Sequence, residues 1–415
     1  MLRLITKSRG RCLELALVVT LLNLFLSFTV VWYSSTPSEN SIASAQDSRL
    51  LLSVEYTGDT AVASESPVSD SVSETGPAII NAQENTPKVK PSEVPSVSEV
   101  PKDVPISAIT NSTVDTRLGV FDKFRRFQSH MFHVVGKAWS TLSSTRALCM
   151  GAQTSVDRLY ELVELVKNWS GPMSIAVFVP DIELAVGLRY IQYLRSCNPA
   201  IEKQVSFHLI YPVEHQGKTS HPDLHGLDEV VGNMDCKQPK QVLKYLLTVR
   251  SKEMLTWRES YPYPQNLLRN LAKNGCQTNY TYIPDIDMVP TSGMDLQLET
   301  FLAKQEMYNC TKCAYVIPTY EVSTKSSHLP TNKTELLQFV KNKQARQFHQ
   351  ALYSINQKSS NLKHWEKIPQ TEEIEIAYKV EKYIFKYEPL YIARGDSPAF
   401  DERFIGFGMT RNTQV

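Results

Sequence analysis

The residues with the clearest chemical content are two aspartates, Asp285 and Asp287, in the segment Tyr280–Pro290. An extended apolar run leads into them, so we expect them to leave a buried strand on the same side of it. Carboxylate oxygens at such an exit suit Mg²⁺ or Mn²⁺, which would in turn bind phosphate oxygens. The pattern therefore predicts a metal site at these two residues, with an ordinary solvated turn as the alternative.

A second polar set lies upstream, in Tyr263–Ala272, where a proline-rich entry opens a predicted helix. Asn266, Arg269 and Asn270 are three or four residues apart and share one face of that helix. An arginine near a metal site can bind a diphosphate through two parallel hydrogen bonds. We predict that these three residues bind a nucleotide; the alternative is a surface arginine on an amphipathic helix.

The elements that must position these residues alternate between strand and helix. Apolar or β-rich runs occupy residues 147–150, 173–179 and 205–211, and helical patterns start at Thr154 or Ser155 and cover 182–194. This alternation predicts an α/β fold with a doubly wound, mostly parallel sheet, in which ligands bind at the carboxyl ends of the strands.

Composition limits the protein classes. The chain has 415 residues, of which 42% are hydrophobic and 21% charged, enough to bury a sizeable core. This excludes full-length disorder, collagen and a small disulfide scaffold. The 44 basic and 43 acidic residues give a net charge of +1, so we expect no nucleic-acid partner.

The N-terminus carries a membrane signal. Four cations, among them Arg9 and Arg11, precede the uncharged run 15–33, which is nearly long enough to cross a bilayer as a helix. We expect residues 1–14 in the cytosol, a transmembrane anchor at 15–33 and the rest in a lumen, as in a single-pass type II membrane protein. A cleaved signal peptide is the alternative, but its apolar run is shorter.

Two segments separate this anchor from the α/β region. Residues 34–116 are rich in Ser, Pro and Glu and nearly lack aromatics, which predicts a disordered stem. Residues 117–142 carry apolar side chains at helical spacing, which predicts an amphipathic helical neck. Such a neck would bind a membrane surface or a partner, or would pack on the following domain or on a second subunit.

Cysteines and glycosylation sequons fit an oxidising lumen. Six cysteines lie beyond Cys12 and allow fifteen disulfide pairings, among which the sequence does not choose. The Cys-x-x-Cys spacing of Cys310 and Cys313 is typical of redox or zinc sites, but we favour structural disulfides. Asn-x-Ser/Thr sequons occur at Asn111, Asn168, Asn279, Asn309 and Asn332.

Several ordered motifs carry a family resemblance: YPQNLLRNLAKNG, YTYIPDIDMVP, AYVIPTYEV and EPLYIARGDSPAFDERFIGFGMTRN. From about Arg146 to the C-terminus the chain resembles glycosyltransferase family 49. The resemblance implies a Golgi enzyme with a GT-A-type mixed sheet in a luminal domain at 143–415, a UDP-sugar donor and Mn²⁺ (or Mg²⁺) held by Asp285 and Asp287. Relatives transfer glucuronic acid to xylose on the O-mannosyl glycan of alpha-dystroglycan.

An inverting transfer also needs a carboxylate that takes the proton of the acceptor hydroxyl. We predict Asp401 or Glu402 for this role, with Glu388 and Glu321 as alternates. Arg403, beside the first pair, is equally suited to be their salt-bridge partner.

Other functions stay open at this point. One is the transfer of N-acetylglucosamine to galactose of poly-N-acetyllactosamine. Another is a non-catalytic, membrane-tethered partner of an active transferase, and a homodimer or a complex with other Golgi transferases is a further expectation. The family pattern continues past the position of Val415 through another strand and a histidine, so we expect a truncated C-terminus.

Overall fold

The computed structural model describes residues 50–55, 115, 118–220, 235–306, 310, 312–384, 386–406 and 411–413. The predicted cytosolic tail and the anchor at 15–33 lie outside these residues, as does most of the predicted stem. Within the described ranges, no helix has the length and apolar character needed to cross a membrane.

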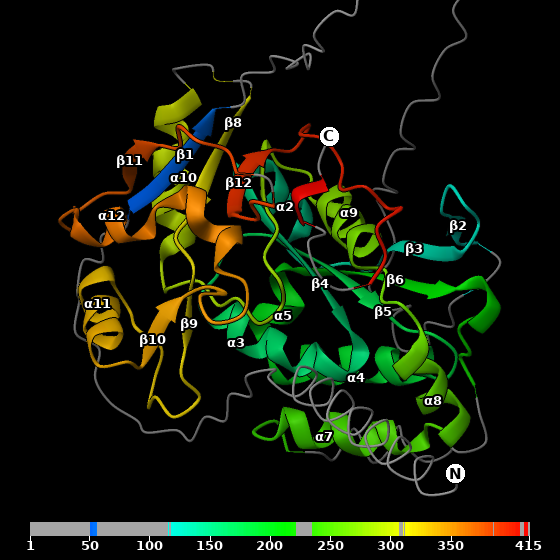
Figure 1. Cartoon of the computed structure of the whole chain (residues 1–415). Helices are drawn as coiled ribbons and strands as arrows, with labels where there is room; N and C mark the ends of the chain where they lie inside the picture. The colour runs from blue at the N-terminus through cyan, green and yellow to red at the C-terminus, as the bar shows by residue number, and fades with distance from the viewer. Residues whose placement is uncertain are drawn as a thin grey trace, which may run out of the picture. The chain divides into compact units, whose positions relative to one another are not determined.

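The fold is built on a ten-stranded mixed sheet in the order β11-β1-β8-β12-β7-β4-β5-β6-β3-β2 (Figure 1). Its strands are β1 Leu50–Glu55, β2 Val120–Phe121, β3 Phe127–Val134, β4 Leu148–Ser155, β5 Met173–Phe178, β6 Val205–Pro212, β7 Tyr280–Tyr282, β8 Cys313–Ile317, β11 Glu375–Lys379 and β12 Leu390–Arg394. The four central strands, β7, β4, β5 and β6, run parallel. On either side the neighbours β12 and β3 are antiparallel, which makes the sheet mixed.

The parallel centre forms where the sequence is continuously apolar. Every residue of β5 and β6 is buried, as expected for strands covered on both faces. The helices are α2 Trp139–Thr145, α3 Leu162–Lys167, α4 Glu183–Cys197, α5 Pro199–Gln204, α7 Pro239–Leu246, α8 Lys252–Ser260, α9 Gln265–Gly275, α10 Met294–Glu306, α11 Lys333–Lys341 and α12 Leu362–Lys367. Among them, α9 packs on β4 and β5 at the middle of the sheet. The predicted α/β class with a mixed sheet is confirmed.

A smaller two-stranded sheet pairs β9 (Tyr320–Val322) with β10 (Ala345–Gln347). Helix α11 lies between its two strands in the chain, and β9 contains Glu321, one of the predicted alternates for the base.

The predicted helical neck at 117–142 is wrong. These residues form β2 and β3, and the first helix of the region, α2, begins only at Trp139. The carboxylate of Asp122 accepts hydrogen bonds from the backbone N–H groups of Phe124, Arg126 and Phe127, which turns the chain back on itself. Strand β3 then extends the sheet by pairing with β6.

The predicted disordered stem is wrong for residues 50–55. Strand β1 forms there and pairs with β8 on one side and β11 on the other. The segment reads Leu-Leu-Leu-Ser-Val-Glu, a local apolar run that the average composition of the stem conceals.

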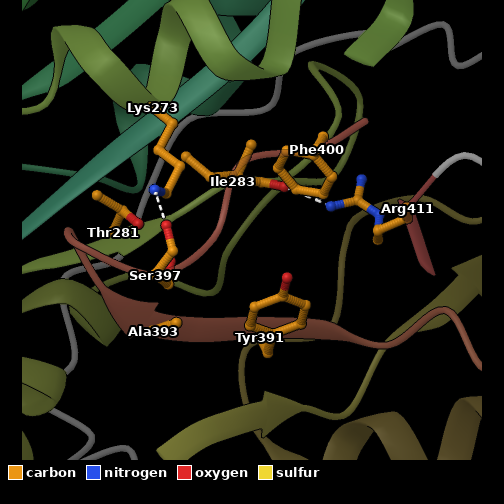
Figure 2. Close-up of a pocket in the computed structure, with 8 residues that line it drawn as sticks. All are labelled: Lys273, Thr281, Ile283, Tyr391, Ala393, Ser397, Phe400 and Arg411. Carbon is orange, nitrogen blue, oxygen red and sulfur yellow. Dashed lines mark hydrogen bonds between the residues drawn. The ribbon is translucent and has the colours of Figure 1, made fainter. Parts of the chain in front are cut away.

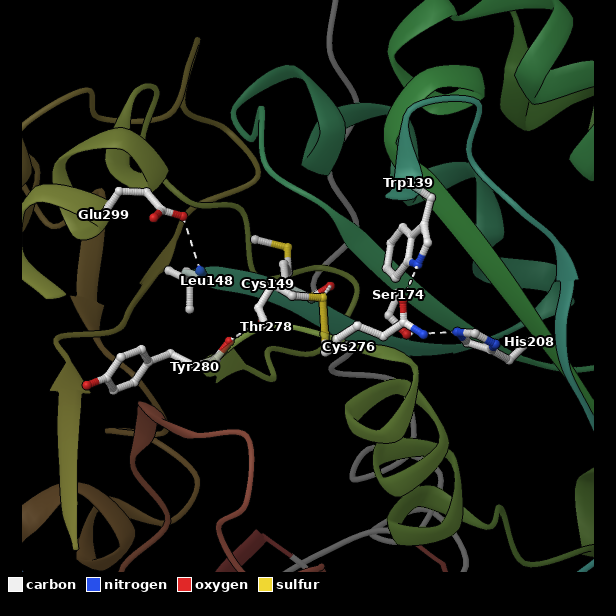
Figure 3. Close-up of a disulfide and its surroundings, with 11 residues drawn as sticks. Trp139, Leu148, Cys149, Ser174, His208, Cys276, Thr278, Tyr280 and Glu299 are labelled. Atoms are coloured by element: carbon white, nitrogen blue, oxygen red, sulfur yellow. Dashed lines mark hydrogen bonds between the residues drawn. A yellow bond between two sulfur atoms is a disulfide. The ribbon is translucent and has the colours of Figure 1, made fainter. Parts of the chain in front are cut away.

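Three disulfides join the six cysteines beyond Cys12. They are Cys149–Cys276, Cys197–Cys236 and Cys310–Cys313. The first joins β4 to the residue after α9 (Figure 3), across a sequence separation of 127 residues. The expected disulfides are therefore present, and Cys310 and Cys313 bind each other and not zinc; their structural role, favoured over a redox one, stays a prediction.

Candidate active site at the exit of strand β7

Asp285 lies three residues after β7 and forms an isolated parallel bridge with Gln153 of β4. Its Oδ1 accepts hydrogen bonds from Arg411 Nη2 at 3.0 Å, Arg269 Nη2 at 3.2 Å and Gln153 Nε2 at 3.2 Å. Burial alone would raise the pKa of Asp285, but the two arginines outweigh it and hold this pKa well below its usual range. Asp285 is therefore an anion that is fixed in place.

Asp287 has a different environment. Its side chain is 48% exposed, and its Oδ2 accepts one hydrogen bond from Arg158 Nη2 at 2.8 Å. The two aspartates lie in a turn, closed by the N–H of Met288 on the carbonyl of Asp285, and not on an extended strand as predicted. Ile286 between them is buried.

Arg158 was not singled out by the sequence. It lies in the 3₁₀ helix Val156–Glu161 that follows β4, and it also forms two hydrogen bonds with Glu161, from Nε at 3.1 Å and from Nη2 at 2.8 Å. A signal for it existed, since a charged residue directly after a parallel strand lies at the edge where ligands bind.

The donor set suits a divalent cation that is shared with a phosphate. Within the described ranges, no side chain donates to Oδ2 of Asp285 or to Oδ1 of Asp287, since their bonds all go to the other oxygen. Mg²⁺ typically takes one or two carboxylates and fills its remaining positions with water and phosphate oxygens. No group of three potential ligand side chains forms a complete metal site in the described part of the chain, so the metal stays a prediction.

The polar face of α9 is buried and not at the surface. Arg269 is 3% exposed and reaches Asp285, so the alternative of a surface arginine is wrong. Asn266 donates to the carbonyl of Asp401 at 2.9 Å, and Asn270 donates to the carbonyl of Phe400 at 2.8 Å. These two amides hold the C-terminal segment against the helix, and their predicted contact with a nucleotide is not tested by the structure.

Two of the four predicted candidates for the base lie in this C-terminal segment. Asp401 forms an ion pair with Arg403, at 2.6 Å between Oδ2 and Nη2, and hydrogen bonds from Arg403 lower the pKa of Asp401. Glu402 accepts a hydrogen bond from Asn270 Nδ2 at 2.8 Å. The salt-bridge role foreseen for Arg403 is therefore confirmed.

The two alternative candidates for the base, Glu321 and Glu388, have different hydrogen-bond partners. Glu321 lies in the small sheet and forms an ion pair with Arg346 at 2.5 Å. Glu388 precedes β12, and its Oε1 accepts the backbone N–H of Arg411 at 3.0 Å. Of these two, Glu388 lies next to a residue that contacts Asp285.

Arg411 is a second residue that sequence reasoning missed. It is 8% exposed and donates to the carbonyl of Ile283 at 2.6 Å as well as to Asp285 (Figure 2). In Figure 2 it lies beside Tyr391 and Phe400, at one end of a small pocket. No local pattern links Arg411 to Asp285, because the two are 126 residues apart in the chain.

A cavity of about 470 Å³ opens at the exit of the neighbouring parallel strand β5. Its lining includes Asp181, Ile182, Lys218, Arg250, Ser251 and Met254. Asp181 and Lys218 form an ion pair at 2.8 Å. Because β4 alone lies between β5 and β7, the two strand exits are two strand spacings apart, about 10 Å. The volume lies within the range of small-molecule sites.

Comparison with known proteins gives a consistent result. The sequence profile of the family described as "Glycosyl-transferase for dystroglycan" matches residues 147–415. Beta-1,4-glucuronyltransferase 1 of Bos taurus and of Homo sapiens are each 32% identical over 269 residues, which is 64% of this chain and 62% of theirs. Xylosyl- and glucuronyltransferase LARGE1 of Homo sapiens is 25% identical over 292 residues, 70% of this chain and 31% of its own. The chain thus spans 62% of the length of the two glucuronyltransferases.

Proposed function

The chain belongs to glycosyltransferase family 49, and from this premise we propose that it transfers a sugar from a UDP-sugar donor to a glycan acceptor. The names of the relatives favour glucuronic acid as the donor sugar. The family description favours dystroglycan as the carrier of the acceptor. Xylose on its O-mannosyl glycan is the acceptor sugar that the sequence resemblance implies. A single displacement with inversion is the proposed course of the reaction.

The observation that carries this proposal is the grouping of charges around β7. Two carboxylates, Asp285 and Asp287, are accompanied by three arginines, Arg158, Arg269 and Arg411. Mixed carboxylate and guanidinium groups are what a metal-bound diphosphate requires, because the carboxylates hold the cation and guanidinium groups bind phosphate oxygens. Mn²⁺ or Mg²⁺ at the two aspartates would offset the charge of the diphosphate leaving group.

The cavity after β5 supports the same donor. It opens at the exit of β5, and this exit is two strand spacings, about 10 Å, from the exit of β7 that leads to Asp285, so one nucleotide could reach both. Asp181 offers a carboxylate to ribose hydroxyls, and Ile182 and Met254 offer an apolar surface to a base. A mixed sheet with its ligands at the carboxyl edge also fits the expected GT-A-type fold.

We also infer that the enzyme is a Golgi membrane protein anchored by residues 15–33, with its catalytic domain in the lumen. This inference rests on the sequence pattern of the N-terminus. An oxidising lumen is consistent with the three disulfides. A homodimer or a complex with other Golgi transferases stays a prediction.

The proposal is tested by incubating the purified full-length chain with a panel of UDP-sugars, acceptor glycans and Mn²⁺. We expect consumption of UDP-glucuronic acid. Asp287→Asn should lower kcat/KM by about 100-fold or more, because a carboxylate that would hold the cation, and through it the diphosphate, is lost. Asp396→Asn is the matched control, since Asp396 is likewise an exposed carboxylate paired with an arginine, Arg394.

Other outcomes separate the alternatives. Consumption of UDP-N-acetylglucosamine with a galactose acceptor would replace the proposed donor and acceptor but keep the transferase. If the folded chain consumes no UDP-sugar in the presence of Mn²⁺, the proposed activity is wrong, and a non-catalytic partner of an active transferase becomes the better account.

A further inference from the structure

Glu388 is linked to Asp285 through one residue, Arg411. The backbone N–H of Arg411 donates to Oε1 of Glu388 at 3.0 Å, and its Nη2 donates to Oδ1 of Asp285 at 3.0 Å. The strands next to the two carboxylates are also neighbours, because β12, which begins two residues after Glu388, is antiparallel to β7, which ends three residues before Asp285. Glu388 therefore lies at the same edge of the sheet as Asp285.

The contacts of Glu388 leave it able to accept a proton. Its Oε1 accepts the backbone N–H of Arg411 at 3.0 Å, which fixes the carboxylate next to the arginine that holds Asp285. The residue is partly exposed, and no described side chain donates to its Oε2. It is also close enough to Arg269 to interact with it electrostatically.

Other carboxylates near the site have guanidinium partners. Asp401 forms its ion pair with Arg403, and Glu161 forms a bidentate pair with Arg158. Arg403 contacts both oxygens of Asp401, and Arg158 contacts both oxygens of Glu161, so neither carboxylate keeps an oxygen without a charged partner. Glu388 receives a single backbone hydrogen bond instead, within the part of the chain that the structure describes.

Glu402 differs from Glu388 in what its partner contacts. Its Oε1 accepts a hydrogen bond from Asn270 Nδ2 at 2.8 Å, and the same amide donates to the carbonyl of Phe400. Glu402 therefore belongs to the contacts that hold the C-terminal segment on α9, whereas the partner of Glu388, Arg411, contacts Asp285. The sequence motif that favours Asp401 or Glu402 does not reveal these partners.

On the premise of the transferase function above, we propose that Glu388 is the catalytic base. The acceptor hydroxyl gives its proton to Oε2 of Glu388 while its oxygen forms a bond to the anomeric carbon of the donor sugar. The bond between that carbon and the diphosphate oxygen breaks, and its electron pair leaves with UDP. The products are the glycoside, UDP and protonated Glu388, so atoms and charge balance.

The test compares the full-length wild type with Glu388→Gln in steady-state kinetics. Glutamine keeps an oxygen that can accept the Arg411 N–H but is not a base. We expect kcat to fall by about 100-fold or more, the usual contribution of a general base. The KM for the UDP-sugar, the affinity for UDP and the melting temperature should stay close to those of the wild type. Glu164→Gln, at an exposed carboxylate paired with Lys167, is the control.

The outcomes are distinguishable from those of the proposed function. If the wild type transfers no sugar, the proposed function is wrong and the base assignment falls with it. If the wild type is active and Glu388→Gln keeps more than about a tenth of its kcat, only the base assignment is overturned. Loss of kcat in Asp401→Asn together with an active Glu388→Gln would return the role to Asp401.

A second variant covers the case in which Glu388→Gln unfolds. Glu388→Asp keeps a carboxylate that is one methylene shorter, so it should keep more kcat than glutamine at equal UDP affinity. If Glu388→Gln unfolds, a folded Glu388→Asp with the kcat of the wild type would contradict a role that depends on the position of this carboxylate. If both variants fold, equal kcat values for the two would contradict a proton-accepting role.

Discussion

Asp285 and Glu183 are each paired with two arginines, but their pKa values are shifted in opposite directions. Asp285 lies between Arg269 and Arg411, and its pKa is lowered. Glu183, at the start of α4 after β5, lies 2.8 Å from Arg250 and 3.3 Å from Arg258. Its pKa is raised to about 7, chiefly by burial.

Hydrogen bonds and neighbouring acids account for the difference. Oδ1 of Asp285 accepts three aligned hydrogen bonds, one of them from the neutral amide of Gln153. The oxygens of Glu183 are at ion-pair distance but make no aligned hydrogen bond among the described residues, and Asp157 and Asp181 add negative charge nearby. The number of arginines around a carboxylate therefore does not decide its charge. Aligned hydrogen-bond donors and nearby acidic residues decide the charge of a buried carboxylate.

The largest expected effect on stability comes from removing the carboxylate of Asp285, which accepts three hydrogen bonds. Asp285→Ala leaves Arg269 and Arg411, which are 3% and 8% exposed, without their shared anion. Breaking a buried pair in this way costs about 3–5 kcal/mol. Urea unfolding of the wild type and the variant measures this difference. A loss below about 1 kcal/mol would mean that the two arginines find other partners and that the contrast with Glu183 is overstated.

A smaller effect is expected for Glu183, with a distinctive pH dependence. Because its pKa is raised above 4.5, the folded state binds this proton more tightly than the unfolded state. The free energy of unfolding should therefore fall as pH rises from about 4.5 to above 7, by about 1–3 kcal/mol. Urea unfolding at pH 5 and pH 8 measures the change, and Glu183→Gln should remove most of it. An unaltered pH slope in that variant would show that other groups cause it.

The smallest effect on stability is expected at the exposed pair. Asp287→Ala removes one contact to Arg158 from a side chain that is 48% exposed. Such pairs contribute about 0–1 kcal/mol, so the unfolding curve should stay near that of the wild type, even though activity is lost. If the free energy of unfolding falls as much as in Asp285→Ala, the proposed distinction between Asp285, held by its partners, and Asp287, available to a ligand, is wrong.

The sequence predicted the parts of the fold that depend on local patterns. Strands β5 and β6 are continuous apolar runs, and their prediction was confirmed because burial on both faces leaves that signal. The neck prediction failed because the helical spacing of its apolar residues does not show that Asp122 closes a turn. A composition average likewise concealed β1.

The site was predicted less completely than the fold. Asp285 and Arg269 do meet, as their positions at a strand exit and on the preceding helix suggested. Arg411 had no local signal, since its contact with Asp285 depends on how the C-terminal segment packs on α9. The contact of Arg411 with Glu388, which links Glu388 to Asp285, is likewise a property of the folded chain.

The contact between Arg411 and Asp285 has a consequence for protein synthesis. The two residues are 126 positions apart, which is roughly 6–25 s of translation at typical ribosomal rates. During that interval a nascent chain holds an aspartate whose second arginine has not yet been made. The proposed catalytic centre is therefore completed later than the parallel strands β4, β5 and β6, and a chain interrupted shortly before Arg411 would contain these strands but lack one of the two arginines that contact Asp285.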